Sequence, residues 1–156
     1  MHHLIFELSF DYPPSMEKRS KKEDLEHFFF WNNPWFLEPF DCYLTLENFR
    51  KELINLLKKE LPKGFRLKGE TITLVDPEPY WQETISHLKA VSSKGTRDEM
   101  PLAWWKHDVC KYGQFFVYLR DTGELMTLHE FLLDSMWKDA STKSYGIGSI
   151  FEVTDD

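Results

Sequence analysis

The tripeptide Asp121-Thr122-Gly123 is the first pattern in this sequence that could do chemistry, because aspartic proteases carry the same three residues. Those enzymes need two aspartates that share one proton, contributed by two lobes or by two subunits. Here Arg120 and Glu124 flank the tripeptide, where such a loop requires apolar and small residues. Asp and Gly also suit a tight turn, through local hydrogen bonding and a positive φ angle. We interpret the tripeptide as a hairpin turn and not as a catalytic site.

A metal site is the second possibility, because His107 and Cys110 have the His-x-x-Cys spacing of half a zinc site. A structural zinc ion takes four protein ligands, which usually come as two such pairs. The other cysteine, Cys42, and the remaining histidines are scattered along the chain, so the sequence offers no second pair. We therefore expect no metal and no cofactor.

Nucleophilic catalysis and phosphate binding have no motif in this sequence. A nucleophile needs a nearby base, and neither cysteine lies in a glycine-rich turn between a strand and a helix. The stretch Gly146-Ile147-Gly148 lacks the third glycine of a phosphate-binding loop. Paired acids such as Glu78 and Glu83 cannot be told apart from the many other carboxylates. The sequence predicts no catalytic residue, although a site assembled from separate elements stays open.

Aromatic content is the one anomaly of composition, since 13 Phe, 6 Trp and 6 Tyr make up 16% of the 156 residues. The densest run covers residues 27–43, and its second half is predicted to be a structured loop because prolines interrupt it. Its rings either cover the core or form a surface that binds a partner. Trp104 and Trp105 are a second candidate surface, since two adjacent rings cannot easily both face inward. In the binding interpretation, the anchors of the first segment and their acidic neighbours are Trp31, Trp35, Phe36, Glu38 and Asp41.

Periodicity predicts the elements that must position these residues. Apolar residues alternate with others over residues 4–12, which predicts a strand with one buried face, and residues 13–24 are predicted to be a mobile loop. Residues 45–61 are predicted to be a helix, and a second helix is predicted from residue 76 to about residue 91. The apolar stripe of the first helix consists of Leu46, Phe49, Leu53, Ile54, Leu56, Leu57 and Leu61.

Hairpins and a capping signal predict the remaining elements. Residues 65–75 have the apolar alternation of two strands with a break at Lys68-Gly69, and residues 115–119 and 125–128 flank the Asp-Thr-Gly turn. Thr127 and Glu130 match a capping box for a short helix, and residues 146–153 are predicted to be a strand. Because strands and helices are interspersed, we expect one α+β domain over residues 1–156, with a mostly antiparallel sheet packed by about three helices on one face.

The net charge of −7, from 26 acidic and 19 basic residues, restricts the partners. A negative field repels phosphate backbones and anionic lipid but attracts basic proteins, so we expect no nucleic acid and no membrane. No apolar run approaches the roughly 20 residues that span a bilayer, and no secretory signal is visible. Two cysteines are too few for a disulfide framework. We therefore expect a soluble protein in the cytoplasm.

These properties favour a non-catalytic protein-binding domain, most of all an inhibitor or immunity-type protein that neutralises a basic protein partner. Acidic residues would steer the partner and exposed rings would supply short-range affinity. In size, acidity and lack of catalytic motifs, the chain resembles bacterial toxin-immunity proteins. Two alternatives stay open, namely a small enzyme or ligand-binding domain with an aromatic-lined pocket and a structural subunit of a larger assembly.

Overall fold

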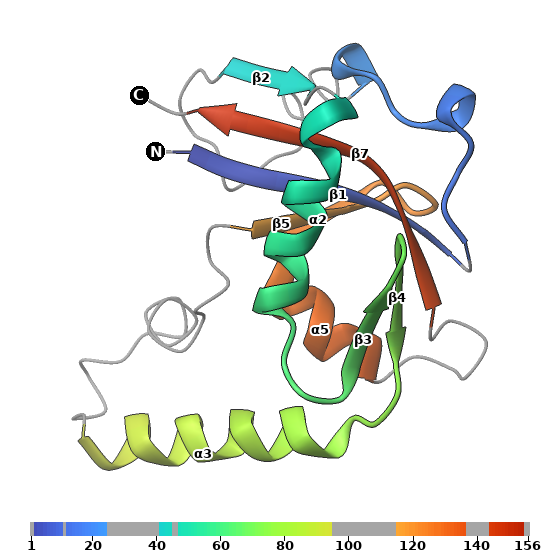
Figure 1. Ribbon diagram of the computed structural model, residues 1–156. Helices are drawn as coiled ribbons and strands as arrows, with labels where there is room; N and C mark the ends of the chain where they lie inside the picture. Colours follow the sequence, from blue (N-terminus) through green and yellow to red (C-terminus); the bar gives the residue numbers. More distant parts are fainter. Residues whose placement is uncertain are drawn as a thin grey trace.

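The described residues form an α+β structure, as the sequence predicts (Figure 1). The computed structural model describes residues 2–10, 12–24, 41–44, 47–94, 115–136 and 144–154. In chain order, the elements are β1 (His2–Phe10), the 3-10 helix η1 (Met16–Lys18), β2 (Asp41–Leu44), α2 (Glu47–Glu60), β3 (Phe65–Lys68), β4 (Thr71–Leu74), α3 (Glu78–Lys94), β5 (Phe115–Leu119), β6 (Glu124–Thr127), α5 (Leu128–Met136) and β7 (Ser144–Thr154).

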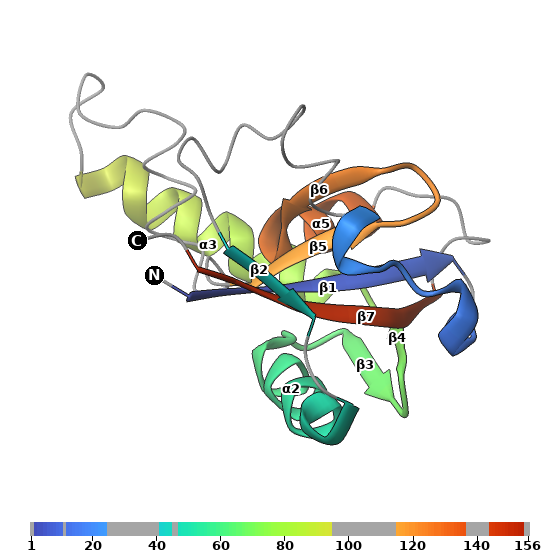
Figure 2. The same cartoon turned by 90° about the horizontal axis from the view of Figure 1, so that it is seen from above.

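All seven strands belong to one sheet, in the order β3-β4-β7-β1-β5-β6, with β2 paired to β7 off this path. β1 and β7 run side by side through the middle of the molecule (Figure 2). β1 and β5 are parallel, whereas the other pairings are antiparallel. The prediction of a mostly antiparallel sheet with about three helices is therefore corrected. The sheet is mixed because β5 pairs with β1 in parallel, after a long connection for which the sequence has no hairpin signal. With η1 included, the described part of the chain has four helices.

The main core lies on one face of the sheet. It combines alternate strand residues, such as Phe6 and Leu8 of β1, with side chains from α2, α3 and α5. A smaller cluster around Ile5 and Phe151 occupies the opposite face. β1 is therefore covered on both faces, whereas its alternation predicts a single buried face. The second face of β1 buries Ile5 and also Glu7, a polar residue that is nevertheless 0% exposed.

Local signals are confirmed at the turns and at the helix starts. The hairpin glycines Gly69 and Gly123 have φ angles of 61° and 73°, a conformation that glycine adopts without strain. The Thr127 hydroxyl accepts the Glu130 N–H at 3.1 Å, which caps α5. Asp76 Oδ1 accepts the Glu78 N–H at 3.1 Å at the start of α3. Turn chemistry and capping are short-range, so the sequence alone can predict them.

The structure describes residues 12–24 but only a small part of the aromatic run 27–43. Residues 12–24 include η1, and the Ser20 N–H donates to the buried Glu7 carboxylate, so this stretch is attached to the sheet. Its mobility stays a prediction. Most of the aromatic run 27–43 lies outside the described residues, and only its last residues are seen, as part of β2. Among the described helices, none has the length and apolar character needed to cross a bilayer.

Candidate interaction surface on helix α2

A bulge in β7 determines where α2 sits. The pairing of β7 with β1 shifts register between Phe6↔Ile150 and Leu8↔Ile147, so one extra residue is accommodated at Gly148-Ser149. On the other edge of β7, β4 pairs before this point and β2 pairs after it. Backbone groups between the two strands therefore need partners from side chains.

Arg50 of α2 supplies these partners on one side. Its guanidinium donates to the carbonyl oxygen of Ile147 at 2.9 Å and to the carbonyl oxygen of Gly148. Its Nε and Nη2 atoms donate to the Glu70 carboxylate, at 2.8 Å and 3.1 Å, so Nη2 bonds both Ile147 and Glu70. Arg50 is only 6% exposed. Its planar fork of donors suits this combination of carbonyls and carboxylate, and it fixes α2 against the edge of β7 between β4 and β2.

Glu7 performs the complementary task for the N–H groups around the bulge. Its carboxylate accepts the Ser149 N–H at 3.2 Å and the Ser20 N–H at 3.0 and 3.1 Å. The Ser149 hydroxyl donates to the Ser20 carbonyl at 2.6 Å. Gly148 has to lack a side chain, because a Cβ there would lie 2.1 Å from Glu7 Oε1. A buried acid and a buried base thus hold the same bulge.

A charge network continues from Arg50 toward solvent. Arg19 lies 3.8 Å from the Glu70 carboxylate and 3.5 Å from that of Glu47, which is also 3.8 Å from Arg50. The hydrogen bond from Arg50 lowers the pKa of Glu70 below its ordinary value of 4.5, against the opposing effect of burial, and Arg19 adds to the lowering. Two arginines and two glutamates therefore balance one another at neutral pH.

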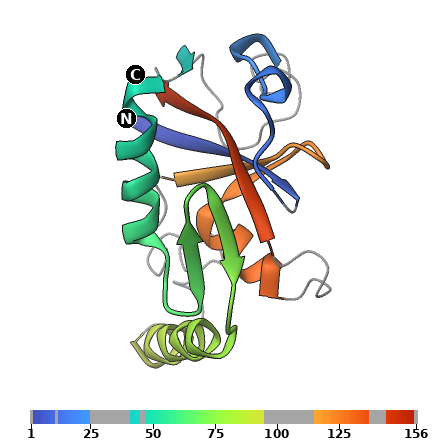
Figure 3. The same cartoon turned by 45° about the vertical axis from the view of Figure 1, so that its right-hand side comes forward.

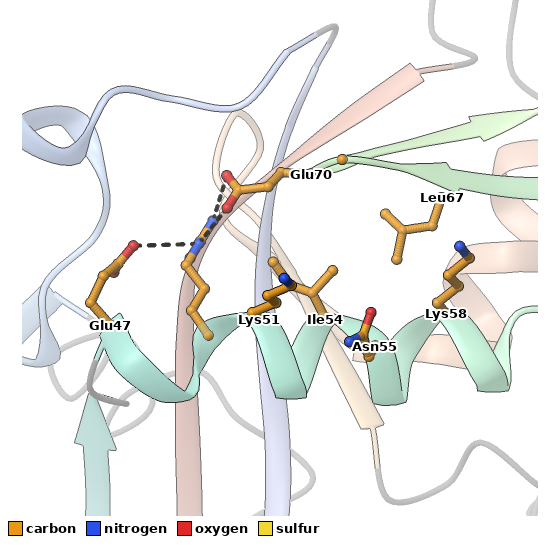
Figure 4. Close-up of a pocket in the computed structure, with 9 residues that line it drawn as sticks. Glu47, Lys51, Ile54, Asn55, Lys58, Leu67 and Glu70 are labelled. Atoms are coloured by element: carbon orange, nitrogen blue, oxygen red, sulfur yellow. Dashed lines mark hydrogen bonds and ion pairs between the residues drawn. The ribbon is translucent and has the colours of Figure 1, made fainter.

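The flank of α2 beside β3 and β4 borders a groove of about 460 Å³. Ile54 and Leu67 point toward each other from its two sides (Figure 4). Both are almost fully buried, so they form its apolar floor. The residues that line the groove are Glu47, Arg50, Lys51, Ile54, Asn55, Lys58, Leu67, Gly69 and Glu70.

The other flank of α2 is apolar and exposed. Phe49 is 49% exposed and Leu56 is 44% exposed, with the half-buried Leu53 between them. We call Phe49, Leu53 and Leu56 the apolar flank; their spacing places them on one side of the helix. Acidic Glu52, which is exposed, and Glu60 belong to the same side.

Only part of the apolar stripe predicted for this helix packs inward. Ile54 and Leu57 are buried, whereas Phe49 and Leu56 are not, and Leu46 lies outside the described residues. The signal was present in the sequence. At 100° per residue, the stripe spans roughly 160°, wider than the roughly 100° that a helix needs to face a core.

The residues that the sequence proposed as partner-binding are mostly beyond what the structure describes. Trp31, Trp35, Phe36, Glu38, Trp104 and Trp105 lie outside the described residues. Asp41 is the first residue of β2, where it pairs with Thr154. Sequence reasoning did not identify the apolar flank as a surface, nor Arg50 as its anchor.

The residues that the sequence raised as candidates for catalysis or metal binding have structural contacts wherever the structure describes them. Asp121 lies between β5 and β6 and accepts the N–H of Phe10, at the end of β1, at 2.8 Å. Tyr80 and His129 are buried and hydrogen-bond to each other, which joins α3 to α5. No group of three or more potential metal ligands occurs among the described residues, and His107 and Cys110 are not among them.

Comparison with known proteins finds no family model, no curated protein and no solved structure that matches this chain.

Proposed function

We propose that this chain is a non-catalytic protein-binding domain of the inhibitor or toxin-immunity type, which neutralises a protein partner with a basic surface. The observation that carries the proposal is the apolar flank of α2. Two large side chains, Phe49 and Leu56, are close to half exposed beside Glu52 and Glu60, on a chain of net charge −7.

An exposed apolar flank gains free energy when a partner covers it and removes it from water. Apolar side chains grouped on one side of an exposed helix are a feature of interaction sites. Burial of an aromatic and an aliphatic anchor supplies affinity, while acidic neighbours and the overall negative charge speed encounters with a basic protein. The helix itself is held rigidly, because Arg50 fastens it to β7. A preorganised helix loses little entropy on binding.

The proposal extends to the residues suggested by the sequence. Trp31, Trp35, Phe36, Glu38, Asp41, Trp104 and Trp105 are candidates for further partner contacts. The expected setting is the cytoplasm, and we expect neither nucleic acid nor membrane as a partner, because the acidic chain repels both.

Affinity capture from the source cell tests the proposal. A tagged wild-type chain should retain a protein of high isoelectric point, and raised salt should weaken the complex. The variant Phe49→Asp with Leu56→Asp should lose that protein. Val75→Asp should keep it, because Val75 is 57% exposed but follows β4 and is not part of the apolar flank. Retention of the same protein by the double variant, or capture of an acidic partner only, would contradict the proposal.

The alternatives give other outcomes in the same preparation. A structural subunit would self-associate, and light scattering of the purified chain would show this without any partner. A ligand-binding domain is favoured by the groove of about 460 Å³, a volume in the range of small-molecule sites. However, none of the described residues that line this groove is aromatic, unlike the pocket that the sequence suggested.

A further inference from the structure

The groove flank of α2 carries unpaired positive charge, although the chain as a whole is acidic. Arg50 and Glu70 satisfy each other at one end of the groove. Lys51 and Lys58 line the same groove and are exposed, and neither forms an ion pair with another described residue. Asn55 lies between them on α2 and adds an amide group. An occupant of this groove should therefore carry negative charge.

Among the described residues, no strand pairs with the sheet edge that borders this groove. β3 is the outermost strand of the sheet, and Figure 3 shows it between α2 and β4. The Val75 N–H donates to the Gly64 carbonyl at 2.7 Å, which fixes the alternation of the hairpin. In that alternation, Leu67 directs its N–H and its C=O away from β4. Leu67 makes no backbone hydrogen bond with other described residues outside the hairpin.

These features together identify the class of ligand. A small anion would use the lysines but would leave the Leu67 backbone groups without partners. An extended peptide can pair with both backbone groups while its acidic side chains reach the ammonium groups. Lys51 and Lys58 are separated by roughly 10 Å along the helix axis, which corresponds to about three residues of extended chain.

We propose that the groove between α2 and β3 binds an extended acidic peptide segment of another protein, which adds a strand to the free edge of β3. Ile54 and Leu67 form the apolar floor for side chains on one face of that strand. The site is independent of the proposed inhibitor function, since it uses the opposite flank of α2.

The direct test uses a fluorescent, end-blocked hexapeptide of alternating glutamate and valine, with binding followed by anisotropy. Lys51→Glu with Lys58→Glu should raise its Kd at least about tenfold. Lys59→Glu is the matched control, because Lys59 is exposed on α2 but does not line the groove. Circular dichroism checks that each variant is folded. An equal loss of binding with Lys59→Glu, or equal binding of a lysine–valine peptide, would overturn the proposal.

Strand addition is tested with the protein unchanged. Two N-methylated peptides each block the amide N–H groups on one edge. Blocking the edge that faces β3 should weaken binding about tenfold, and blocking the other edge should not. Equal binding of the two versions would overturn strand addition. Inorganic phosphate and succinate are tested alone by NMR, and binding of either as tightly as the peptide would show a small-anion site instead.

Discussion

Phe49 and Arg50 are neighbours in sequence but have environments opposite to those expected from their polarity. Phe49 is 49% exposed, whereas Arg50 is 6% exposed. Arg50 is buried because carbonyl groups at the β7 bulge need donors, and Phe49 is exposed because the buried side of α2 is already filled. In this helix, the hydrogen-bonding needs of the β7 backbone decide that Arg50 is buried, and part of the apolar surface stays exposed.

The largest expected effect on stability comes from replacing the buried residue of this pair, Arg50. Arg50→Met should lower the free energy of unfolding by about 3 kcal/mol, because two carbonyls and Glu70 lose their donors. Urea denaturation followed by circular dichroism measures it. Arg50→Lys keeps the charge but lacks the planar fork, so it should recover less than half of the loss. A neutral or stabilising Arg50→Met would show that the fold does not need this charge.

The second effect tests the acid on the other side of the bulge. Glu7→Gln should cost about 2 kcal/mol, because an amide nitrogen would face N–H groups that now donate to a carboxylate. Chemical denaturation measures the loss. Glu124→Gln, an exposed position on β6, is the control and should leave stability unchanged. Equal stability of Glu7→Gln and the wild type would mean that the bulge does not depend on this carboxylate.

A smaller effect should appear at Glu70, and it depends on pH. Glu70→Gln should cost about 1 kcal/mol at pH 7, at the low end because the carboxylate is partly exposed. Since its pKa in the folded protein lies below 4.5, the ionised form stabilises the fold above that pH. The contribution is lost as the pH falls through the lowered pKa. Unfolding curves of wild type and variant should therefore converge below pH 4.5, and a constant difference would contradict this assignment.

The smallest effect on stability belongs to the apolar flank. Phe49→Gln and Leu56→Gln should each change the free energy of unfolding by at most about 0.5 kcal/mol, because close to half of each side chain is already in water and only the rest loses contacts. Partner binding should nevertheless be lost. Calorimetry measures the stability of each variant, and the capture experiment measures its partner binding on the same samples. A fall in Tm of many degrees would assign these side chains to the core.

Local signals account for the parts of the fold that the sequence predicts well. Gly69 and Gly123 specify their hairpins, and Thr127 and Asp76 specify helix starts, all through contacts within a few residues. The parallel pairing of β1 with β5 has no such signal, because it joins segments more than one hundred residues apart. A sequence pattern cannot show which distant strand will lie alongside.

The candidate site was predicted less well, for a related reason. The alternation of β1 placed Glu7 on a polar face. In the structure, Glu7 is buried and its carboxylate accepts a backbone N–H from the bulge at Gly148-Ser149. The width of the apolar arc on α2 could have indicated an exposed flank. The aromatic segment at 27–43 and Trp104-Trp105 stay predictions, because apart from the backbone of β2 they lie outside the described residues.

The position of β7 has a consequence for how the chain acquires its shape. The two hairpins can close from neighbouring residues, but the central strand β7 pairs with β1 between residues as far apart as His2 and Thr154. Contacts of such long range raise the entropic barrier and slow the search for the native state. Because β7 is synthesised last, β1 and β4 each keep one strand edge unpaired until it is made. We expect slow refolding and, at high concentration, aggregation through these unpaired edges.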